Sequence, residues 1–478
     1  MSSELPSYVA AARPVPQSNR VAWYKSTAQT YAGIMLWFVF WQDVPVGSGI
    51  DPSAGQFAKF AGGTLAHGLG VALLALIIAA LICHFLFYVV PGMLGMKTGL
   101  PLYILGTSTY GVNGGFIMPG FLMGVLQFGW LGVSAFFSAL LLCQPFGYGP
   151  LTVPHAVVAA IWALAAAFMG LKGIQYVAKV ASLFPLIPLA ILVILLVAAA
   201  GGIGSFDPQA LVVASKAKTV ALAGGATASA LPALPVWGII ALMCTYIVGF
   251  FATAGAAGAD FGMNNRDGKD VQWGGLVGIA GATIFAGGVA LLIVAGLQGL
   301  HKAPDLAVLR ATDLMGYAVG TGTAKVMMYL LAIAAFPPAC FSAFIAANSF
   351  KTTLPKVNPY VSVGVGTAVS ILLAVTGWAG NVVGVFQIIG ASFGPICGAM
   401  AADYLLSGKQ WAGPRAGFNP AGWISWAIGF AVGAGDFIPG LKGNIPAPPV
   451  AAFIVGFVLY LILAKAGLES RKLPMPKA

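Results

Sequence analysis

The stretch Leu234–Phe261, LPVWGIIALMCTYIVGFFATAGAAGADF, decides the fold class of this chain. It is long enough to cross a lipid bilayer, because about 20 apolar residues at 1.5 Å each span the hydrocarbon layer. Its second half carries three glycines, the first being Gly249, directly before Phe250 and Phe251. Glycine costs about 1 kcal/mol relative to alanine inside a helix, and freed backbone groups in lipid must line a cavity or contact protein. The stretch therefore favours either a discontinuous transporter-type helix that weakens at Gly249 or a continuous helix with small residues for close packing.

The rest of the chain has the composition of a multi-pass membrane protein. Of its 478 residues, 59% are hydrophobic and only 7% are charged, against about 25% charged residues in soluble proteins. The first 20 residues lack an apolar segment of signal-peptide type, so we expect no cleaved signal. The five cysteines show no Cys-x-x-Cys spacing and lie in or beside apolar stretches, which predicts neither disulfides nor a metal site. They are Cys83, Cys143, Cys244, Cys340 and Cys397.

Twelve apolar stretches, each bounded by proline, glycine or charged residues, are the predicted transmembrane helices. They are 27–47, 67–91, 113–142, 152–172, 177–201, 234–261, 272–299, 324–349, 359–378, 380–405, 420–437 and 447–465. With the N-terminus in the cytoplasm, most of the 23 Lys and Arg residues fall on the cytoplasmic side, as the positive-inside rule requires. We therefore expect a protein of the inner (plasma) membrane with both termini cytoplasmic. This topology explains the net charge of +11 without a nucleic-acid partner.

One polar and one aromatic side chain inside the third stretch form a candidate binding face. Gln127 and Trp130 are three residues apart and share one face of a helix. A Gln amide offers a donor beside an acceptor and can pair with the edge of a nucleobase, and a Trp ring stacks on a base with about 1–3 kcal/mol. An interhelical hydrogen bond from Gln127 and a core role for Trp130 are the alternative.

A series of short motifs runs in order along most of the chain. They are PVPQSNR at 14–20, GMKTGL at 95–100, YGVNGG at 110–115, LQFGWLGV at 126–133, GADF at 258–261, AADYL at 401–405, FIPGLKGNIP at 437–446 and LYLIL at 459–463. In order and spacing, these motifs resemble the cytosine permease branch of the nucleobase–cation symporter family.

The resemblance implies an all-α polytopic membrane fold with 12 transmembrane helices. Ten of them form a five-plus-five inverted repeat with discontinuous helices 1 and 6, and two extra helices follow at the C-terminal end. The expected divisions are a cytoplasmic segment 1–26, the first repeat 27–201, an extracellular loop 202–233 that packs as a cap or is flexible, the second repeat 234–405, helices 11 and 12 in 406–465, and a cytoplasmic tail 466–478.

The resemblance also implies where a substrate binds, between helices 1, 3, 6 and 8. Gln127 would hydrogen-bond a base, and Trp130 and Phe251 would stack on its two faces. Gly249 and Phe250 would present backbone groups at the break in helix 6.

Helix 1 departs from its relatives in the middle. IMLWFVFWQDVP at 34–45 carries large apolar residues, among them Trp37 and Phe38, where relatives have small or hydroxyl residues. Nothing between Gly33 and Pro45 is expected to break the helix, and Phe38 is expected to line a narrowed site.

Helix 8 departs as well. In FPPACFSAFIAAN at 336–348, Pro337 and Pro338 are expected to bend the helix, and only Ser342 and Asn348 supply side-chain oxygens. We assign both oxygens to the substrate site and Ser342 also to a coupling cation. Because one hydroxyl and some freed carbonyls make a thin shell, we expect weak dependence on sodium.

Three carboxylates lie near the ends of helices. Asp43 is a candidate carrier of the coupling proton, or a solvated residue at a helix end. Asp260 and Asp403 are candidate gate or structural residues on the cytoplasmic side, and pairing with Arg266, Lys269 or free helix ends is the alternative.

The sequence thus predicts a secondary active transporter that imports cytosine or a related pyrimidine or purine by alternating access. We expect a coupling ion, sodium or a proton, and no other cofactor. The expected partners are a small-molecule substrate and the lipid bilayer, and the expected state is a monomer. The alternatives are a transporter of the same fold with another small metabolite and a transport-inactive sensor or scaffold. We expect no enzyme, because HExxH and phosphate-loop motifs are absent from the sequence, and its one GxSxG run, GASFG at 390–394, lies inside the predicted helix 380–405.

Overall fold

The computed structural model describes residues 5–47, 60–222, 232–302 and 308–475. In these ranges the regular structure is helical, and two isolated β-bridges join Val21 to Asn265 and Arg415 to Lys472. The α-helices are α1 (Ser7–Ala10), α2 (Thr27–Met35), α3 (Phe38–Gln42), α4 (Leu69–Ile82), α5 (Val89–Thr98), α6 (Leu102–Tyr110), α7 (Leu122–Cys143), α8 (Val153–Lys172), α9 (Ile174–Ala181), α10 (Leu186–Ala199), α11 (Pro208–Leu222), α12 (Val236–Ala256), α13 (Gly258–Gly262), α14 (Gly268–Gly275), α15 (Ala282–Gly299), α16 (Met315–Val319), α17 (Thr321–Thr353), α18 (Pro359–Val375), α19 (Val382–Leu406), α20 (Pro420–Gly433) and α21 (Pro448–Lys465).

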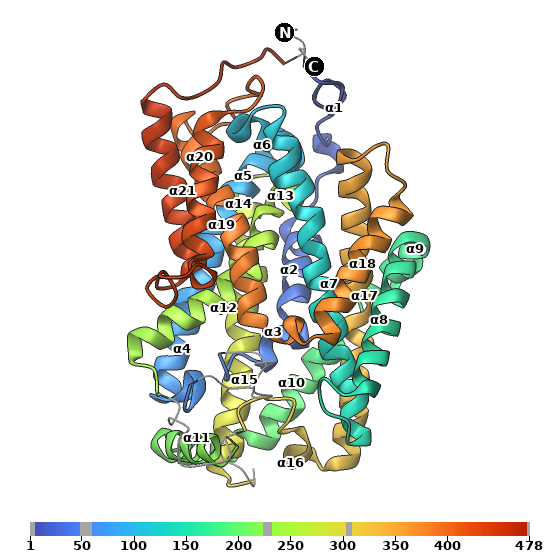
Figure 1. Cartoon of the computed structure of the whole chain (residues 1–478), viewed down its shortest axis with the longest axis vertical. Helices are drawn as coiled ribbons and strands as arrows, with labels where there is room; N and C mark the ends of the chain where they lie inside the picture. Colours follow the sequence, from blue (N-terminus) through green and yellow to red (C-terminus); the bar gives the residue numbers. More distant parts are fainter. Residues whose placement is uncertain (1–4, 48–59, 223–231, 303–307, 476–478) are drawn as a thin grey trace.

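Most of these helices run along the long axis of the molecule (Figure 1). Within the described ranges, nine helical segments are long and apolar enough to cross a membrane, and α18 is a shorter apolar helix. The first predicted stretch contains α2 and α3, and the eleventh contains α20. The chain is therefore a multi-pass, all-helical membrane protein. Both termini lie at one end, here called the terminal end, and α11 and α16 lie at the opposite, distal end (Figure 1).

The first membrane segment is broken, so the prediction of an unbroken helix between Gly33 and Pro45 is wrong. α2 ends at Met35, α3 begins at Phe38, and Trp37 between them has an extended backbone, with φ −60° and ψ 126°. The break is supported by side chains: Trp41 Nε1 donates to the Leu36 carbonyl at 3.1 Å. From α12, the Tyr246 hydroxyl donates to the carbonyls of Val39 (3.1 Å) and Phe40 (2.6 Å). Polar groups of neighbouring side chains thus replace helical hydrogen bonds that the backbone gives up.

The sixth segment does not break at Gly249, and that prediction is also wrong. α12 continues through Gly249 and Phe250 to Ala256, and the interruption comes at Ala257, before α13. A Cβ at position 249 would lie 2.5 Å from the Phe386 carbonyl oxygen of α19. Gly249 therefore permits close packing of two helices rather than unwinding one of them.

Three helical segments contain π-helical turns. They are Cys83–Tyr88 between α4 and α5, Phe116–Phe121 before α7, and Leu276–Gly281 between α14 and α15. The turn at Cys83–Tyr88 falls in the second predicted stretch, and the turn at Leu276–Gly281 falls in the seventh. A five-plus-five repeat would pair these two stretches. In α17, by contrast, the helix runs on through Pro337 and Pro338 for 33 residues.

The described part of the predicted loop 202–233 is largely helical. α11 occupies Pro208–Leu222, and its Leu211 and Val212 are buried against the distal end of the bundle. The described half therefore packs as a cap, while residues 223–231 lie outside the described ranges. All five cysteines are free and buried.

Candidate functional site

Gln127 and Trp130 lie on one face of α7, as their spacing predicts. The Gln127 side chain is buried, and its amide nitrogen lies 3.7 Å from the Met123 sulfur, a weak acceptor one turn back. The Gln127 amide is therefore held only weakly by its own helix. Trp130 is half-buried.

Trp130 belongs to an aromatic cluster of four rings: Trp37 at the break between α2 and α3, Trp130 on α7, Phe250 on α12 and Phe386 on α19. The Trp130 ring centroid lies 5.3 Å from that of Phe250, with the planes at 88°, and 5.9 Å from that of Trp37. Phe386 lies 5.3 Å from Trp130 and 5.4 Å from Phe250. The cluster thus gathers flat apolar faces from four helical segments, and its Trp130 shares a face of α7 with Gln127, an arrangement suited to a planar ring.

Phe250 and Phe251 point in different directions. Phe250 faces Trp130, whereas Phe251 is fully buried and packs on Tyr31 of α2 at 5.6 Å. The family resemblance implied that Phe251 is the ring opposite Trp130, but the structure puts Phe250 in that position. Phe38 is buried next to the cluster, with its ring 6.5 Å from that of Trp37.

The two helix-8 residues make their described hydrogen bonds within α17. The Ser342 hydroxyl is buried and donates to the Pro338 carbonyl at 3.3 Å. Asn348 is exposed, and its backbone carbonyl accepts from Thr352. These contacts do not join either residue to the aromatic cluster.

Trp37 is the residue that sequence reasoning left out of the site. Its ring stacks on Phe250, with centroids 6.3 Å apart and planes at 28°. Its indole N–H is buried and has no hydrogen-bond partner among the described residues. The sequence did contain a signal for Trp37: it is a large aromatic residue at the position where the family resemblance implies that helix 1 unwinds.

At the distal end, Asp43 is the partner of an arginine from a later loop. Arg310 Nε lies 2.7 Å from Asp43 Oδ1, and both side chains are almost fully buried. The guanidinium also lies 5.1 Å from the Phe137 ring centroid on α7. Beside this pair, the Thr312 hydroxyl donates to Gln42 Oε1 at 2.9 Å. The loop that carries Arg310 and Thr312 is therefore bound to the end of α3.

Asp260 and Asp403 bind different partners near the terminal end. Asp260 Oδ1 accepts from the backbone N–H of Leu102, the first residue of α6, at 2.9 Å. Of the expected partners of Asp260, a free helix end is therefore the one found, whereas Arg266 pairs with Asp270 at 2.7 Å. Asp260 thus caps the N-terminus of α6.

Asp403 is bound to Arg415 of the loop after α19. Arg415 Nη1 lies 3.0 Å from Asp403 Oδ1, and Nη2 lies 2.6 Å from Glu469 Oε1. Ser108 and Thr109 of α6 also donate to Asp403. Burial lowers the pKa of Arg415, but the acidic groups around it, led by Asp403, outweigh burial and raise that pKa. These contacts hold the tail, α6 and α19 together.

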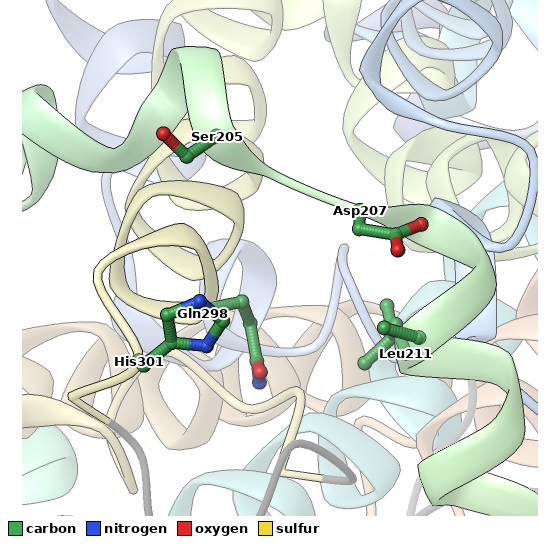
Figure 2. Close-up of a pocket in the computed structure, with 6 residues that line it drawn as sticks. Ser205, Asp207, Leu211, Gln298 and His301 are labelled. Atoms are coloured by element: carbon green, nitrogen blue, oxygen red, sulfur yellow. The ribbon is translucent and has the colours of Figure 1, made fainter.

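Two other observations bear on the site. A small hollow at the distal end lies between the start of α11 and the end of α15 (Figure 2), away from the aromatic cluster. Ser205, Asp207, Ala210, Leu211, Gln298 and His301 line it. Across residues 5–47, 60–222, 232–302 and 308–475, no group of three His, Cys, Asp or Glu side chains could hold a metal ion.

No family model matches the chain. In sequence it is similar to the cytosine permease of Escherichia coli strain K12, with 24% identity over 422 residues, 85% of this chain and 87% of the permease. In structure it is similar to Mhp1, described as a nucleobase-cation-symport-1 family transporter, in a closed conformation with bromovinylhydantoin bound. That match has a TM-score of 0.61 and 17% identity, and covers 98% of this chain and 96% of Mhp1. The inward-facing conformation of Mhp1 gives a TM-score of 0.64 with 16% identity, and covers 97% of both chains.

These comparisons support the resemblance that the sequence motifs indicated. The named relatives are a permease and a transporter rather than enzymes. The shared fold is an all-helical membrane bundle.

Proposed function

We propose that this chain, a relative of the nucleobase–cation symporters, is a secondary transporter that carries a nucleobase across the membrane by alternating access. The substrate class we assign is cytosine or a related planar heterocycle. It would bind against Trp130 and Phe250, whose rings contact each other at 5.3 Å here and would have to separate to admit it, with its polar edge on Gln127.

One observation carries this proposal: an aromatic cluster forms at the break in the first membrane segment, and its Trp130 shares a face of α7 with Gln127, whose amide is buried and weakly held. A planar ring gains area and stacking energy from such rings, and the Gln127 amide can pair with a donor and an acceptor on one edge. Cytosine, in the name of the permease, and the hydantoin bound to Mhp1 have rings of this kind.

Trp37 favours a second candidate, a transporter of the same fold with a different, smaller planar metabolite. The Trp37 ring occupies the break and contacts both Trp130 and Phe250. A ligand that enters between these rings must displace Trp37 or be small. A panel that includes pyrimidines, purines and hydantoins separates these cases.

We further propose that transport is coupled to a cation, with weak dependence on sodium. Ser342 remains the candidate ion ligand on α17, and its hydroxyl is already engaged by Pro338. Asp43 is the candidate acidic residue, and its pairing with Arg310 closes the distal end. Asp260 and Asp403 act as structural residues of the terminal end, which we assign to the cytoplasmic face of the inner membrane.

The binding test uses the purified full-length protein and a panel of bases, with thermal unfolding as the readout. A pyrimidine or purine base should raise the unfolding temperature, and Trp130→Ala should weaken binding by more than about 1 kcal/mol. Trp273→Ala is the matched control, because Trp273 is exposed on α14 and lies outside the cluster. If no base on the panel shifts unfolding or is taken up, the substrate assignment is wrong.

Transport itself is tested by uptake of labelled cytosine into proteoliposomes, with sodium and pH varied separately. Uptake that changes little with sodium agrees with the proposal. Strong sodium-driven uptake would mean that backbone carbonyls complete a sodium site after all. Binding without uptake would indicate the transport-inactive alternative.

A further inference from the structure

A hollow with three cationic side chains opens at the terminal end, where the N-terminal segment meets the loop between α13 and α14. Arg20, Val21, Ala22, Tyr24, Lys25 and Arg266 line it, and its volume is about 180 Å³. It lies outside the substrate site and has no role in the transport mechanism described above.

The walls of this hollow come from two segments that are far apart in the sequence and are bonded to each other. The backbone N–H of Val21 donates to the Asn264 carbonyl at 2.8 Å, and Gln17 Nε2 donates to the Arg266 carbonyl at 3.0 Å. On the N-terminal side, the Trp23 N–H donates to Asp270 Oδ1 at 3.2 Å. The hollow is therefore built by tertiary contacts and not by chance exposure of one loop.

The charges around the hollow do not cancel. Asp270 pairs with Arg266 at 2.7 Å and neutralises it. Arg20 Nη1 donates to the Met96 carbonyl at 2.6 Å, a neutral acceptor that leaves the guanidinium charge uncompensated. Lys25 is exposed. Asp267 also acts on Arg266 from the same loop, so the positive excess of the hollow comes from Arg20 and Lys25 and is reduced by that carboxylate.

Exposed aromatic rings set the depth of the hollow in the membrane. Tyr24 is 54% exposed at the entry to α2, and Trp273 is 52% exposed on the adjoining α14. Exposed Tyr and Trp side chains gather at the level of the lipid headgroups. The cations of the hollow therefore lie where phosphates of the membrane surface are found.

We propose that this hollow binds a phosphate-bearing anion, supplied either by the headgroup of an anionic lipid or by free phosphate. Basic pockets between membrane helices attract anionic headgroups, with a substantial contribution from each Lys or Arg near the surface. An anion there would join Arg20 and Lys25 on the N-terminal segment to Arg266 on the α13–α14 loop. It would thereby stabilise the contact between the N-terminal segment and the α13–α14 loop at the terminal end.

The test measures lipid retained by the full-length protein in nanodiscs of phosphatidylcholine and phosphatidylglycerol, by native mass spectrometry. The protein should retain phosphatidylglycerol in preference to phosphatidylcholine. Lys25→Gln should weaken this binding roughly fivefold, and Lys25→Arg should restore it. Lys356→Gln is the matched control, since Lys356 is exposed at the same end, between α17 and α18, outside the hollow. The Lys25 effect should shrink as salt is raised.

A second arm separates the two sources of phosphate. Competition by inorganic phosphate, with the same dependence on Lys25, supports the site with free phosphate as its ligand. Retention of phosphatidylglycerol unaffected by inorganic phosphate supports the lipid headgroup. Equal losses in Lys25→Gln and Lys356→Gln, or no preference for the anionic lipid and no effect of phosphate, would overturn the proposal. None of these readouts depends on which substrate is transported.

Discussion

At the scale of single residues, specificity depends on Gln127. The other side chains of the cluster are aromatic rings whose polar groups are the indole N–H donors of Trp37 and Trp130, so they can hold a flat ring but offer no acceptor to its edge. Gln127 alone among them presents a donor and an acceptor side by side, and its only described side-chain contact is the weak one to Met123.

Gln127→Leu should lower the affinity for the preferred base about tenfold, which corresponds to the loss of about 1–2 kcal/mol of hydrogen bonding. The unfolding temperature without ligand should not fall, because no strong internal bond is lost. Isothermal titration and thermal unfolding measure the two quantities. The matched control is Gln387→Leu, which removes a buried bond to the Gly433 carbonyl (3.1 Å) and should reduce stability but not affinity. Unchanged affinity in Gln127→Leu would remove Gln127 from the site.

Residue-level prediction succeeded for α7 and was incomplete for α12. Gln127 and Trp130 share a face because residues three apart always do so on a helix. Phe250 and Phe251 are adjacent, so they point about 100° apart, and the rotation of α12 decides which one meets Trp130. That rotation is set by contacts with α19, which the sequence of α12 alone does not contain.

At the scale of elements, the break in the first segment is held open from outside. Helix-breaking residues are absent from Met35 to Phe40, so local propensity would continue the helix. The carbonyls released there accept from Trp41 and from Tyr246 of α12 instead. The segment was predictable from hydropathy. Its break was implied by the family resemblance but not by the local sequence, because a tertiary contact overrides local preference.

Tyr246→Phe should destabilise the protein by about 1–2 kcal/mol, since two buried carbonyls lose a donor. It should also slow uptake, because the shape of the break forms one wall of the aromatic cluster. Thermal unfolding and initial uptake rates measure these effects. Tyr176→Phe, which changes a tyrosine that is 63% exposed, should alter neither quantity. A Tyr246→Phe variant with normal stability would show that the break persists without this support.

The packing of α12 on α19 gives a second prediction for an element. Gly249→Ala should cost about 1–3 kcal/mol, because the new methyl group would lie 2.5 Å from the Phe386 carbonyl oxygen. Gly322→Ala, in α17, meets no atom within 4 Å and should leave stability unchanged or raise it by up to about 1 kcal/mol. Equal unfolding temperatures for the two variants would contradict the close approach of α12 and α19.

At the scale of the whole molecule, both ends carry buried polar contacts made by loops. At the distal end the 308–314 segment is tied to α3 by Arg310 and Thr312. At the terminal end Arg415 ties α19 to the tail. Alternating access requires that these ends open in turn, so each set of contacts must be broken and remade in a transport cycle. The positions of helices follow from hydropathy, but these loop contacts join residues 12 to 270 positions apart and leave no local pattern.

Asp43→Asn should destabilise the closed distal end, because Arg310 loses the carboxylate beside it in a buried setting. Removing one partner of a buried ion pair costs about 3–5 kcal/mol. We expect a lower unfolding temperature and a larger population with the distal end open. Exchange of both charges, Asp43→Arg with Arg310→Asp, should recover part of the loss. Asp207→Asn is the control, since Asp207 is exposed at the same end and Asn also caps a helix well. Equal behaviour of the Asp43 and Asp207 variants would exclude a gating role for the pair.

The burial of all five cysteines has a practical consequence for following this cycle. A maleimide added to the native chain in its closed form finds no accessible sulfhydryl, so its labelling background is low. A single reporter such as Ala311→Cys, within the distal 308–314 segment where Ala311 is fully buried, would react only when that segment moves away from the bundle. Opening can therefore be measured as the labelling rate of one introduced thiol, and a cysteine-free background does not have to be engineered first.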